Sequence, residues 1–229
     1  MIQKEEKLAA EEFDKWAKKG FASSMESGHF PVAKKAMDKI SINSNHTLLD
    51  LSCGNGWAGK YFLSKGISRA VETDISFEML KETEVNLSEF KNKLSVQSSV
   101  HLLPFKENSF DIVFNMESFY YYKNPEKVLK EILRVMKNNG IFLLLVDFYK
   151  ESRISMRWSE RLKIYMNPLS INEYKRLLEK NGFNGIKIER IKSPNIREKE
   201  KFEPSDSIKT YEEYLEFKMA GTLSITAKK

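Results

Sequence analysis

The stretch Thr47-Leu48-Leu49-Asp50-Leu51-Ser52-Cys53-Gly54-Asn55-Gly56 decides the fold class of this chain. Its first half is short and apolar, which is typical of a buried strand in a parallel sheet. Its second half consists of small, turn-forming residues, and apolar residues then recur at helical spacing from Trp57 onward. A strand, a tight glycine turn and a helix in this order predict the start of a nucleotide-binding βαβ unit.

Asp50 indicates which ligand this turn binds. The run Gly54-Asn55-Gly56-Trp57-Ala58-Gly59 fits the GxGxxG pattern of dinucleotide sites, where a pyrophosphate lies at a helix N-terminus. A carboxylate at the end of the strand would repel that anion, but it suits a ligand that carries positive charge and no phosphate. S-adenosylmethionine (SAM) has a sulfonium, an ammonium and no phosphate. The alternative is that Asp50 is only a turn residue at a strand end.

The same segment, 50–56, resembles motif I of the class I SAM-dependent methyltransferases, usually Asp-Leu-Gly-Cys-Gly-x-Gly. The resemblance implies that Asp50, Ser52, Cys53 and the residues Gly54-Asn55-Gly56 bind SAM. Ser52 stands where the family usually has glycine, and serine is tolerable there if this position does not need positive φ. We interpret Cys53 as a small packing residue and not as a nucleophile.

A second match follows in the family's order, in the stretch Asp74-Ile75-Ser76-Phe77-Glu78-Met79-Leu80. An ionised Asp74 at the end of the next strand can accept hydrogen bonds from both hydroxyls of a ribose. Glu72 is a rival for this role, but the family pattern favours Asp74. Ile75 and Met79 would form the wall of the adenine site, and ordinary core packing is the alternative for both.

Two further matches lie in 97–105 and in 108–142. Family members often have an Asp that binds the adenine amino group where this chain has Ser99, a weaker acceptor, so adenine recognition would depend more on the backbone at Val100 and His101. Asn115 ends the strand of the last match and is assigned to the SAM site. The four ordered matches imply a Rossmann-like three-layer α/β/α sandwich, with a seven-stranded, mostly parallel sheet whose last strand is antiparallel.

The pattern along the chain agrees with this fold class. Strands are expected near 47–51, 69–74, 94–98, 110–115, 141–146, 185–191 and 222–227, and helices near 3–19, 31–40, 56–65, 76–88, 125–137, 170–181 and 207–219. Pro31 should open the second helix. We expect one domain with an N-terminal helical lid over 1–45, a SAM-binding core over 46–147, and a substrate-side segment with sheet closure over 148–229.

The composition limits the classes of protein to which this chain can belong. The 229 residues are 41% hydrophobic and 31% charged, without a run long enough for a membrane helix. The acidic N-terminus is unlike a signal peptide, and a single cysteine fits a reducing cytoplasm. Three His and one Cys, widely separated, predict no metal site. The net charge of +6 is spread along the chain, so a nucleic-acid partner is disfavoured.

The acceptor side is predicted from aromatic residues and one histidine. His29 is the candidate general base because histidine titrates near neutral pH, with a structural role as the alternative. Tyr120 and Tyr121 follow the fourth strand, where relatives often have two His, and either orient the acceptor or pack on the next helix. The substrate pocket is assigned to Tyr122, Trp158, Tyr165 and Met166, and the alternative for the last three is that they only cover the sheet. No Asn-Pro-Pro-Tyr motif follows the strand, which disfavours methylation of DNA bases.

The sequence therefore predicts a cytoplasmic enzyme that transfers a methyl group from SAM to a small-molecule acceptor and releases S-adenosylhomocysteine. Three alternatives stay open: an RNA or protein methyltransferase, an NAD-dependent oxidoreductase, and a SAM-binding regulator without catalysis. The acceptor atom and the oligomeric state are not readable from the sequence.

Overall fold

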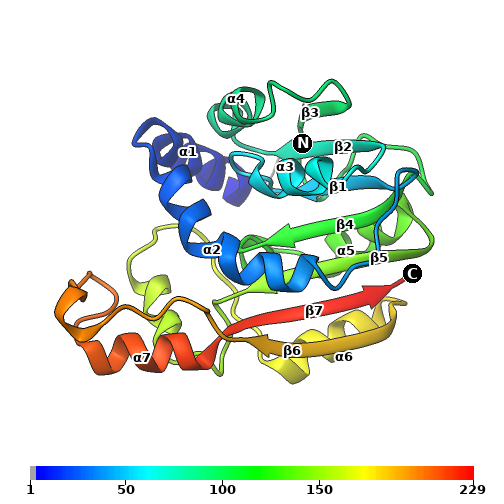
Figure 1. The fold of residues 1–229 in the computed structure, drawn as a ribbon. Helices are drawn as coiled ribbons and strands as arrows, with labels where there is room; N and C mark the ends of the chain where they lie inside the picture. Colours follow the sequence, from blue (N-terminus) through cyan, green and yellow to red (C-terminus); the bar gives the residue numbers. More distant parts are fainter. Residues whose placement is uncertain (1–3) are drawn as a thin grey trace.

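A computed structural model describes residues 4–229 of the chain, so residues 1–3 of the expected lid lie outside the described part. A central sheet has the strand order β3-β2-β1-β4-β5-β7-β6. Figure 1 shows β3 and α4 at one end of this sheet and β6 at the other.

The strands are β1 (Thr47–Leu51), β2 (Arg69–Asp74), β3 (Lys93–Gln97), β4 (Phe110–Met116), β5 (Met136–Val146), β6 (Asn184–Ile191) and β7 (Thr222–Lys228). The α-helices are α1 (Lys4–Lys18), α2 (Phe21–Met37), α3 (Trp57–Ser64), α4 (Phe77–Asn86), α5 (Pro125–Val135), α6 (Ile171–Lys180) and α7 (Tyr211–Ala220). Short 3₁₀ segments cover Phe119–Tyr121, Ser155–Glu160 and Lys199–Lys201.

The predicted sheet is confirmed. The strands β1 to β5 pair in parallel, whereas β7 runs antiparallel to both β5 and β6. The alternation of strands and helices produces this order, because each helix carries the chain back over the sheet before the next parallel strand. The carboxyl ends of the parallel strands therefore meet at one edge, together with the glycine turn after β1.

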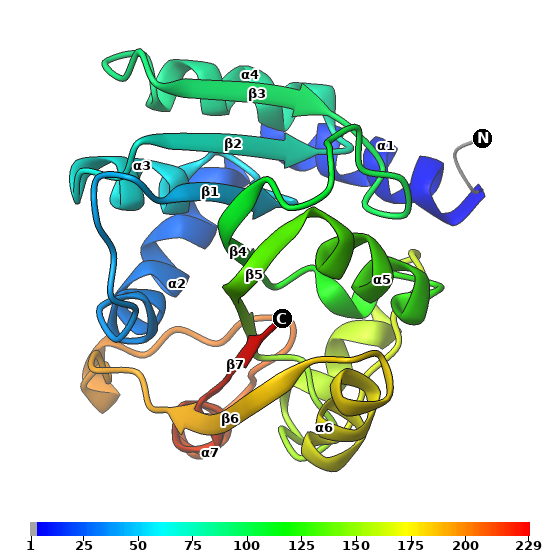
Figure 2. The same cartoon turned by 90° about the vertical axis from the view of Figure 1, so that its right-hand side faces the viewer.

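Both faces of the sheet are buried by helices. Figure 2 shows α2 and α3 on one side of the strands and α5 and α6 on the other. Successive residues of β1 alternate between the two apolar layers: Leu48 packs in the layer under α2 and α3, and Leu49 packs in the layer under α5 and α6. Because both faces of β1 are buried, the run 47–51 consists mainly of apolar residues.

The prediction for the second helix was wrong. Instead of starting at Pro31, α2 begins at Phe21 and contains Pro31 in its interior. The helix starts after Gly20, which adopts a left-handed φ of 69°. Proline removes one backbone donor and disfavours the helical turn before it. However, Ala22 before Pro31 and Val32 after it are both buried, and this burial favours a continuous helix.

The C-terminal elements follow the predicted order. A capping box at Ser170 and Glu173 opens α6, and Thr210 caps α7 by accepting from the backbone N–H of Glu213. Among the described helices, none combines the length and the apolar character needed to span a bilayer.

Candidate active site

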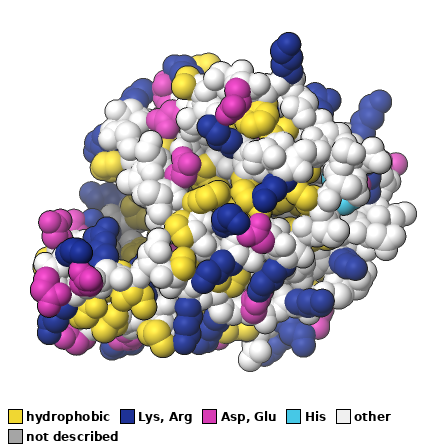
Figure 3. Space-filling view, in the orientation of Figure 1, with side chains coloured by type: hydrophobic (Ala, Val, Ile, Leu, Met, Phe, Trp, Pro, Cys, Tyr) yellow, Lys and Arg dark blue, Asp and Glu magenta, His cyan; other side chains and the backbone are white. Residues whose placement is uncertain are grey.

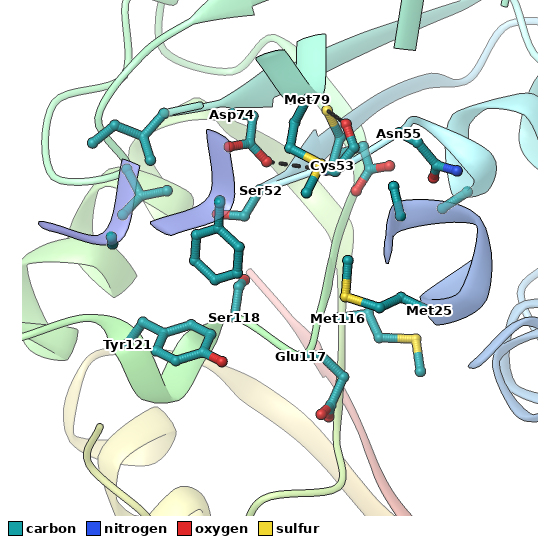
Figure 4. Close-up of a pocket in the computed structure, with 18 of the residues that line it drawn as sticks. Met25, Ser52, Cys53, Asn55, Asp74, Met79, Met116, Glu117, Ser118 and Tyr121 are labelled. Atoms are coloured by element: carbon teal, nitrogen blue, oxygen red, sulfur yellow. Dashed lines mark hydrogen bonds between the residues drawn. The ribbon is translucent and has the colours of Figure 1, made fainter. Parts of the chain in front are cut away.

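The main cavity lies at the carboxyl ends of the parallel strands, beneath α1 and the start of α2. It encloses about 1060 Å³ of space, counting the solvent at its mouth. Figure 4 shows Asp74 and Met79 at one end of this cavity and Glu117 and Tyr121 at the other. Thirteen predicted site residues line it: His29, Asp50, Ser52, Cys53, Gly54, Asn55, Asp74, Ile75, Met79, Val100, His101, Tyr121 and Tyr122.

The turn after β1 forms the floor of the cavity. Ser52 adopts a φ of 55°, so the condition under which serine would replace glycine without strain is not met. Its Oγ atom lies 2.9 Å from the hydroxyl of Tyr122, and this hydrogen bond holds the strained residue in place. Gly56 also has positive φ, but it does not line the cavity: a Cβ atom there would lie 2.7 Å from Thr83 of α4. Gly56 is therefore needed for close packing.

Two buried acids lie side by side beneath this turn. Asp50 pairs with Glu72 in the β1–β2 register, and Gly59 of α3 leaves room for the Glu72 carboxyl. Burial raises the pKa of Asp50 to about 7, and burial together with the charge of Asp50 raises the pKa of Glu72 well above its usual value. Asp50 lines the cavity and its Oδ2 atom is buried without a hydrogen-bond donor, whereas Glu72 does not line the cavity.

Asp74 connects the turn to the next strand. Its Oδ2 accepts from the backbone N–H of Gly54 at 3.0 Å, and its Oδ1 accepts from the backbone N–H of Ser76 at 2.8 Å. Burial raises its pKa to about 6, although both of these hydrogen bonds lower it. The carboxyl is thus held at a fixed position at the cavity wall, with further acceptor capacity on both oxygens.

The helix α1 adds a carboxyl group that the sequence analysis missed. Glu6 bonds to the hydroxyl of Ser99, and its Oε1 atom lies 2.8 Å from Nδ1 of His101. Ser99 itself does not line the cavity, but Glu6 does. The Nε2 atom of His101 is buried without a partner among the described residues. Glu6, Ala9 and Phe13 lie at helical spacing, so the amphipathic pattern of α1 could have indicated this face.

Asn115 does not reach the cavity. It is fully buried, and its Nδ2 donates to the carbonyl of Leu51 at 2.8 Å and to the Tyr122 hydroxyl at 3.0 Å. The Tyr122 hydroxyl is also 2.8 Å from Oγ of Ser118. Asn115 therefore supports the cavity wall from behind by fixing Tyr122.

One cluster of titratable groups lies at the Glu117 end of the cavity. Ligand atoms of His29, Glu117 and Asp147 all lie within 4.8 Å of one another, although the sequence predicted no such grouping. Glu117 adopts a φ of 54°, and its carboxylate accepts from the Asp147 backbone N–H and, at 3.0 Å, from the Tyr120 hydroxyl. Burial lowers the pKa of His29 and raises that of Glu117. The three residues come from α2, the end of β4 and the end of β5, and such long-range proximity gives no local sequence signal.

Four predicted acceptor-side residues lie outside the cavity lining: Tyr120, Trp158, Tyr165 and Met166. Trp158 stacks on Phe148 with ring centroids 6.2 Å apart and also contacts Phe217. Tyr120 is buried behind Glu117. The segment 148–169 covers the apolar layer under α5 and α6, where burial of its aromatic side chains is favourable.

The sequence analysis missed part of the lining because those residues are mostly small or apolar. These residues are Glu6, Ala9, Phe13, Ala22, Met25, Trp57, Ala58, Phe114, Met116, Glu117 and Ser118.

Comparisons with known proteins agree on the type of fold. A family model described as a methyltransferase domain matches residues 49–144. The solved complex between the Haloferax volcanii Trm112 methyltransferase activator and a protein described as a methyltransferase contains a chain with 30% identity, a TM-score of 0.89, and coverage of 95% of this chain and 97% of that one. A SAM-dependent methyltransferase from Aquifex aeolicus has the same fold, with a TM-score of 0.63, 18% identity and coverage of 91% and 96%.

Human mitochondrial arginine-hydroxylase NDUFAF5 is 29% identical over 172 residues. The match covers 69% of this chain and 48% of NDUFAF5, so the chain spans about half the length of that curated relative.

Proposed function

The chain belongs to the class I SAM-dependent methyltransferases, and from this premise we propose that it is a cytoplasmic enzyme that methylates a small-molecule acceptor. The single observation that carries the proposal is the cavity at the carboxyl ends of the strands, where thirteen of the predicted site residues come together. Its location is the one expected for a ligand of an open α/β sheet.

The residues of the cavity suit SAM. The Oδ2 atom of Asp50 and the Nε2 atom of His101 are buried, line the cavity and have no hydrogen-bond partner among residues 4–229. A cofactor with an amino group and an adenosine offers partners to such atoms. Among residues 4–229, the lining contains no Lys or Arg that would balance a pyrophosphate. Family membership and this charge pattern both argue against the NAD-dependent alternative.

We assign roles on the cofactor side as follows. Asp50 orders the ammonium side of SAM, Asp74 accepts from the ribose hydroxyls, and the N-terminus of α3 after Gly56 faces the cofactor carboxylate. Ile75 and Met79 flank the adenine. SAM supplies an activated methyl group, so the protein's contribution is to align the acceptor with it, and such alignment can supply several kcal/mol.

The helices α1 and α2 act as a lid in this proposal. Glu6 on α1 bonds to the loop after β3, while Glu26 on α2 accepts at 2.8 Å from Nδ2 of Asn55 in the motif I turn. These contacts close the cavity from above and exclude water from the reacting groups. His29 on α2 lies on the acceptor side, where a neutral imidazole can take a proton from the acceptor.

Labelled SAM incubated with the small-molecule fraction of a cell extract tests the proposal. We expect transfer of label to a small molecule, and we expect His29→Ala to reduce turnover at least tenfold while SAM affinity is unchanged. His46→Ala, which removes a loop histidine that bonds to Asn43, is the matched control. Label that enters only RNA or protein fractions would establish the other acceptor class, and SAM binding without any transfer would support the regulator alternative.

We also propose that a Trm112-type protein binds the β3 edge of the sheet. The proposal is motivated by the Haloferax volcanii complex and by the position of exposed apolar side chains. Of eight large hydrophobic residues that are exposed in the described chain, four belong to α4, β3 and the loop that follows: Phe77, Val85, Leu94 and Leu102. An unpaired edge strand beside such residues can accept another strand.

Co-expression with the Trm112-type protein of the same source, followed by size-exclusion chromatography, tests this partner. The two chains should elute together, and Leu94→Glu should separate them, whereas Met219→Glu on α7 should not. Separate elution of the two unmodified proteins would contradict the proposal.

A further inference from the structure

The main cavity has a strongly acidic lining. Four carboxyl side chains line it, from Glu6, Asp50, Asp74 and Glu117, and no Lys or Arg does so. By contrast, the face of the molecule drawn in Figure 3 carries Lys and Arg mixed with Asp and Glu. The acidic character is therefore a property of the cavity and not of the chain, whose net charge is +6.

Three of the four carboxyls have local partners. Glu6 is bonded to His101 and Ser99, and Asp74 accepts two backbone N–H groups. Asp50 lies beside Glu72, and the raised pKa values of this pair favour a retained proton at neutral pH. The negative charges of these three carboxyls are thus balanced by neighbouring groups of the chain and, in the proposed complex, by the cationic groups of SAM.

Glu117 differs from these three. Its oxygens accept only from neutral donors, the Tyr120 hydroxyl and the Asp147 backbone N–H. Asp147, directly behind it and 9% exposed, accepts at 2.5 Å from the Thr222 hydroxyl. Neither acid forms an ion pair with a Lys or Arg in the described part of the chain. Enclosing two neighbouring carboxylates without a cation is costly, and burial together with the charge of Asp147 raises the pKa of Glu117 well above its usual value. A cationic ligand that binds the ionised carboxylate would offset this cost.

A lysine that lies close to this cluster does not pair with either acid. Lys218 of α7 lines a smaller cavity together with His29 and Asp147. Its Nζ atom, however, lies over the rings of Tyr214 and Phe217, at 5.7 and 5.6 Å from their centroids. The neighbouring groups that face the acids are His29, which is neutral when its pKa is lowered by burial, and Tyr121 on the cavity wall.

We propose that the acceptor carries a protonated amine or guanidinium group, and that Glu117, backed by Asp147, binds this group beside the ring of Tyr121. The inference rests on the proposed function and narrows its substrate class. A cationic nitrogen offers several N–H donors to the free lone pairs of the Glu117 carboxylate, the charge of Asp147 behind it adds attraction, and an aromatic face adds more. The left-handed backbone of Glu117 and the donors Tyr120 and Asp147 fix the carboxylate in the direction of the cavity.

A divalent cation would also balance the charge of Glu117 and Asp147, but the cluster of these two acids with His29 is poorly suited to bind one. Metal-bound histidines generally donate their second ring nitrogen to an acceptor that orients the ring. Neither ring nitrogen of His29 has a hydrogen-bond partner among residues 4–229, so this orientation is missing.

The test separates the small-molecule fraction of a cell extract by ion exchange and incubates each part with labelled SAM and enzyme. Label should enter products from the part retained on a cation exchanger. For that acceptor, Glu117→Gln should raise KM at least tenfold with SAM affinity unchanged, and Asp147→Asn should raise it less. Glu107→Gln, on an exposed loop, is the matched control and should change neither value.

Three results would overturn the inference. The first is transfer to acceptors from the unretained or anion-exchange parts. The second is a loss of activity on EDTA treatment that Mg²⁺ or Mn²⁺ restores, which would assign the cluster to a metal. The third is SAM binding with no methyl transfer to any part of the extract. This result would contradict both the proposed function and the inference, whereas transfer to a neutral or anionic acceptor would contradict the inference alone.

Discussion

At the scale of single residues, the site depends on acids that the fold keeps in unfavourable surroundings. Asp50 and Glu72 are 2% and 0% exposed, and their carboxyls occupy neighbouring positions in the β1–β2 register. Ser52 and Glu117 are held at positive φ at the cavity wall. A backbone held at positive φ costs on the order of 1–3 kcal/mol of stability per residue. Strained and desolvated residues of this kind concentrate at functional sites.

The buried Glu72 predicts a pH dependence of stability. Its folded pKa is raised, so above pH 4.5 the folded state holds a proton that the unfolded chain has released. This costs about 1.4 kcal/mol for each pH unit up to the folded pKa. Glu72→Gln removes the cost, so the variant should gain stability over the parent protein as the pH rises from 5 to 8.

Urea denaturation at the two pH values measures this gain, with the exposed Glu89→Gln as control. An equal stability difference at pH 5 and pH 8 would show that Glu72 does not hold a proton in the folded protein.

At the scale of elements, the close packing of α3 on β2 depends on a missing side chain. A Cβ atom on Gly59 would lie 1.8 Å from Oε1 of Glu72. Gly59→Ala should therefore destabilise the protein by about 1–3 kcal/mol, as overpacking usually does. Adding Glu72→Ala should recover most of that loss, because it removes the clashing carboxyl.

Gly28 of α2 is the matched control for this cycle. Nothing lies within 4 Å of a Cβ atom at that position, so Gly28→Ala should be neutral or stabilise the helix by about 0.5–1 kcal/mol. If Gly59→Ala is tolerated as well as Gly28→Ala in denaturation experiments, the packing account is wrong.

Most elements could be predicted from sequence because each has a local signal. The apolar run 47–51 and the cap at Ser76 are readable without the fold. The start of α2 could not be predicted, since Pro31 is a strong local signal for a first turn and only the burial of Ala22 against α1 and of Val32 in the core overrides it. Likewise β5 begins at Met136, directly after α5, before the apolar run that marked the expected strand.

The candidate site was predictable on its cofactor side and much less so on its acceptor side. Asp50 lies in β1 and Asp74 ends β2, and each stands in a stretch that resembles a family motif, so their position at the cavity could be predicted. The amphipathic pattern of α1 could have indicated the face that carries Glu6, but nothing in the sequence brings Asp147, which follows β5, next to Glu117 and His29. Trp158 packs on Phe148 outside the cavity lining, and the sequence left both positions open because an aromatic residue in an irregular segment gives the same signal in a pocket and over a core.

At the scale of the whole molecule, α1 is joined to the sheet through the cofactor side. Asp14 accepts at 2.5 Å from the Ser76 hydroxyl and at 3.2 Å from the backbone N–H of Glu78, and Glu6 bonds to His101. If α1 is a lid, a bound cofactor should hold it down. We predict that S-adenosylhomocysteine slows amide hydrogen exchange in α1 at least tenfold.

The helix α6, which covers the opposite face of the sheet, is the internal control in the same exchange experiment. Its amides should be slowed far less. Equal protection of α1 and α6 would mean that ligand binding stabilises the whole domain without closing a lid.

The most direct test of the account is calorimetric titration of the protein with S-adenosylhomocysteine, which cannot donate a methyl group. We predict binding to the unmodified protein and to Asp206→Ala, an exposed control, and a loss of affinity of at least tenfold, about 1.4 kcal/mol, for Asp74→Ala. Equal affinity in Asp74→Ala, or binding of NAD⁺ in place of the nucleoside, would contradict the assignment of this cavity to SAM.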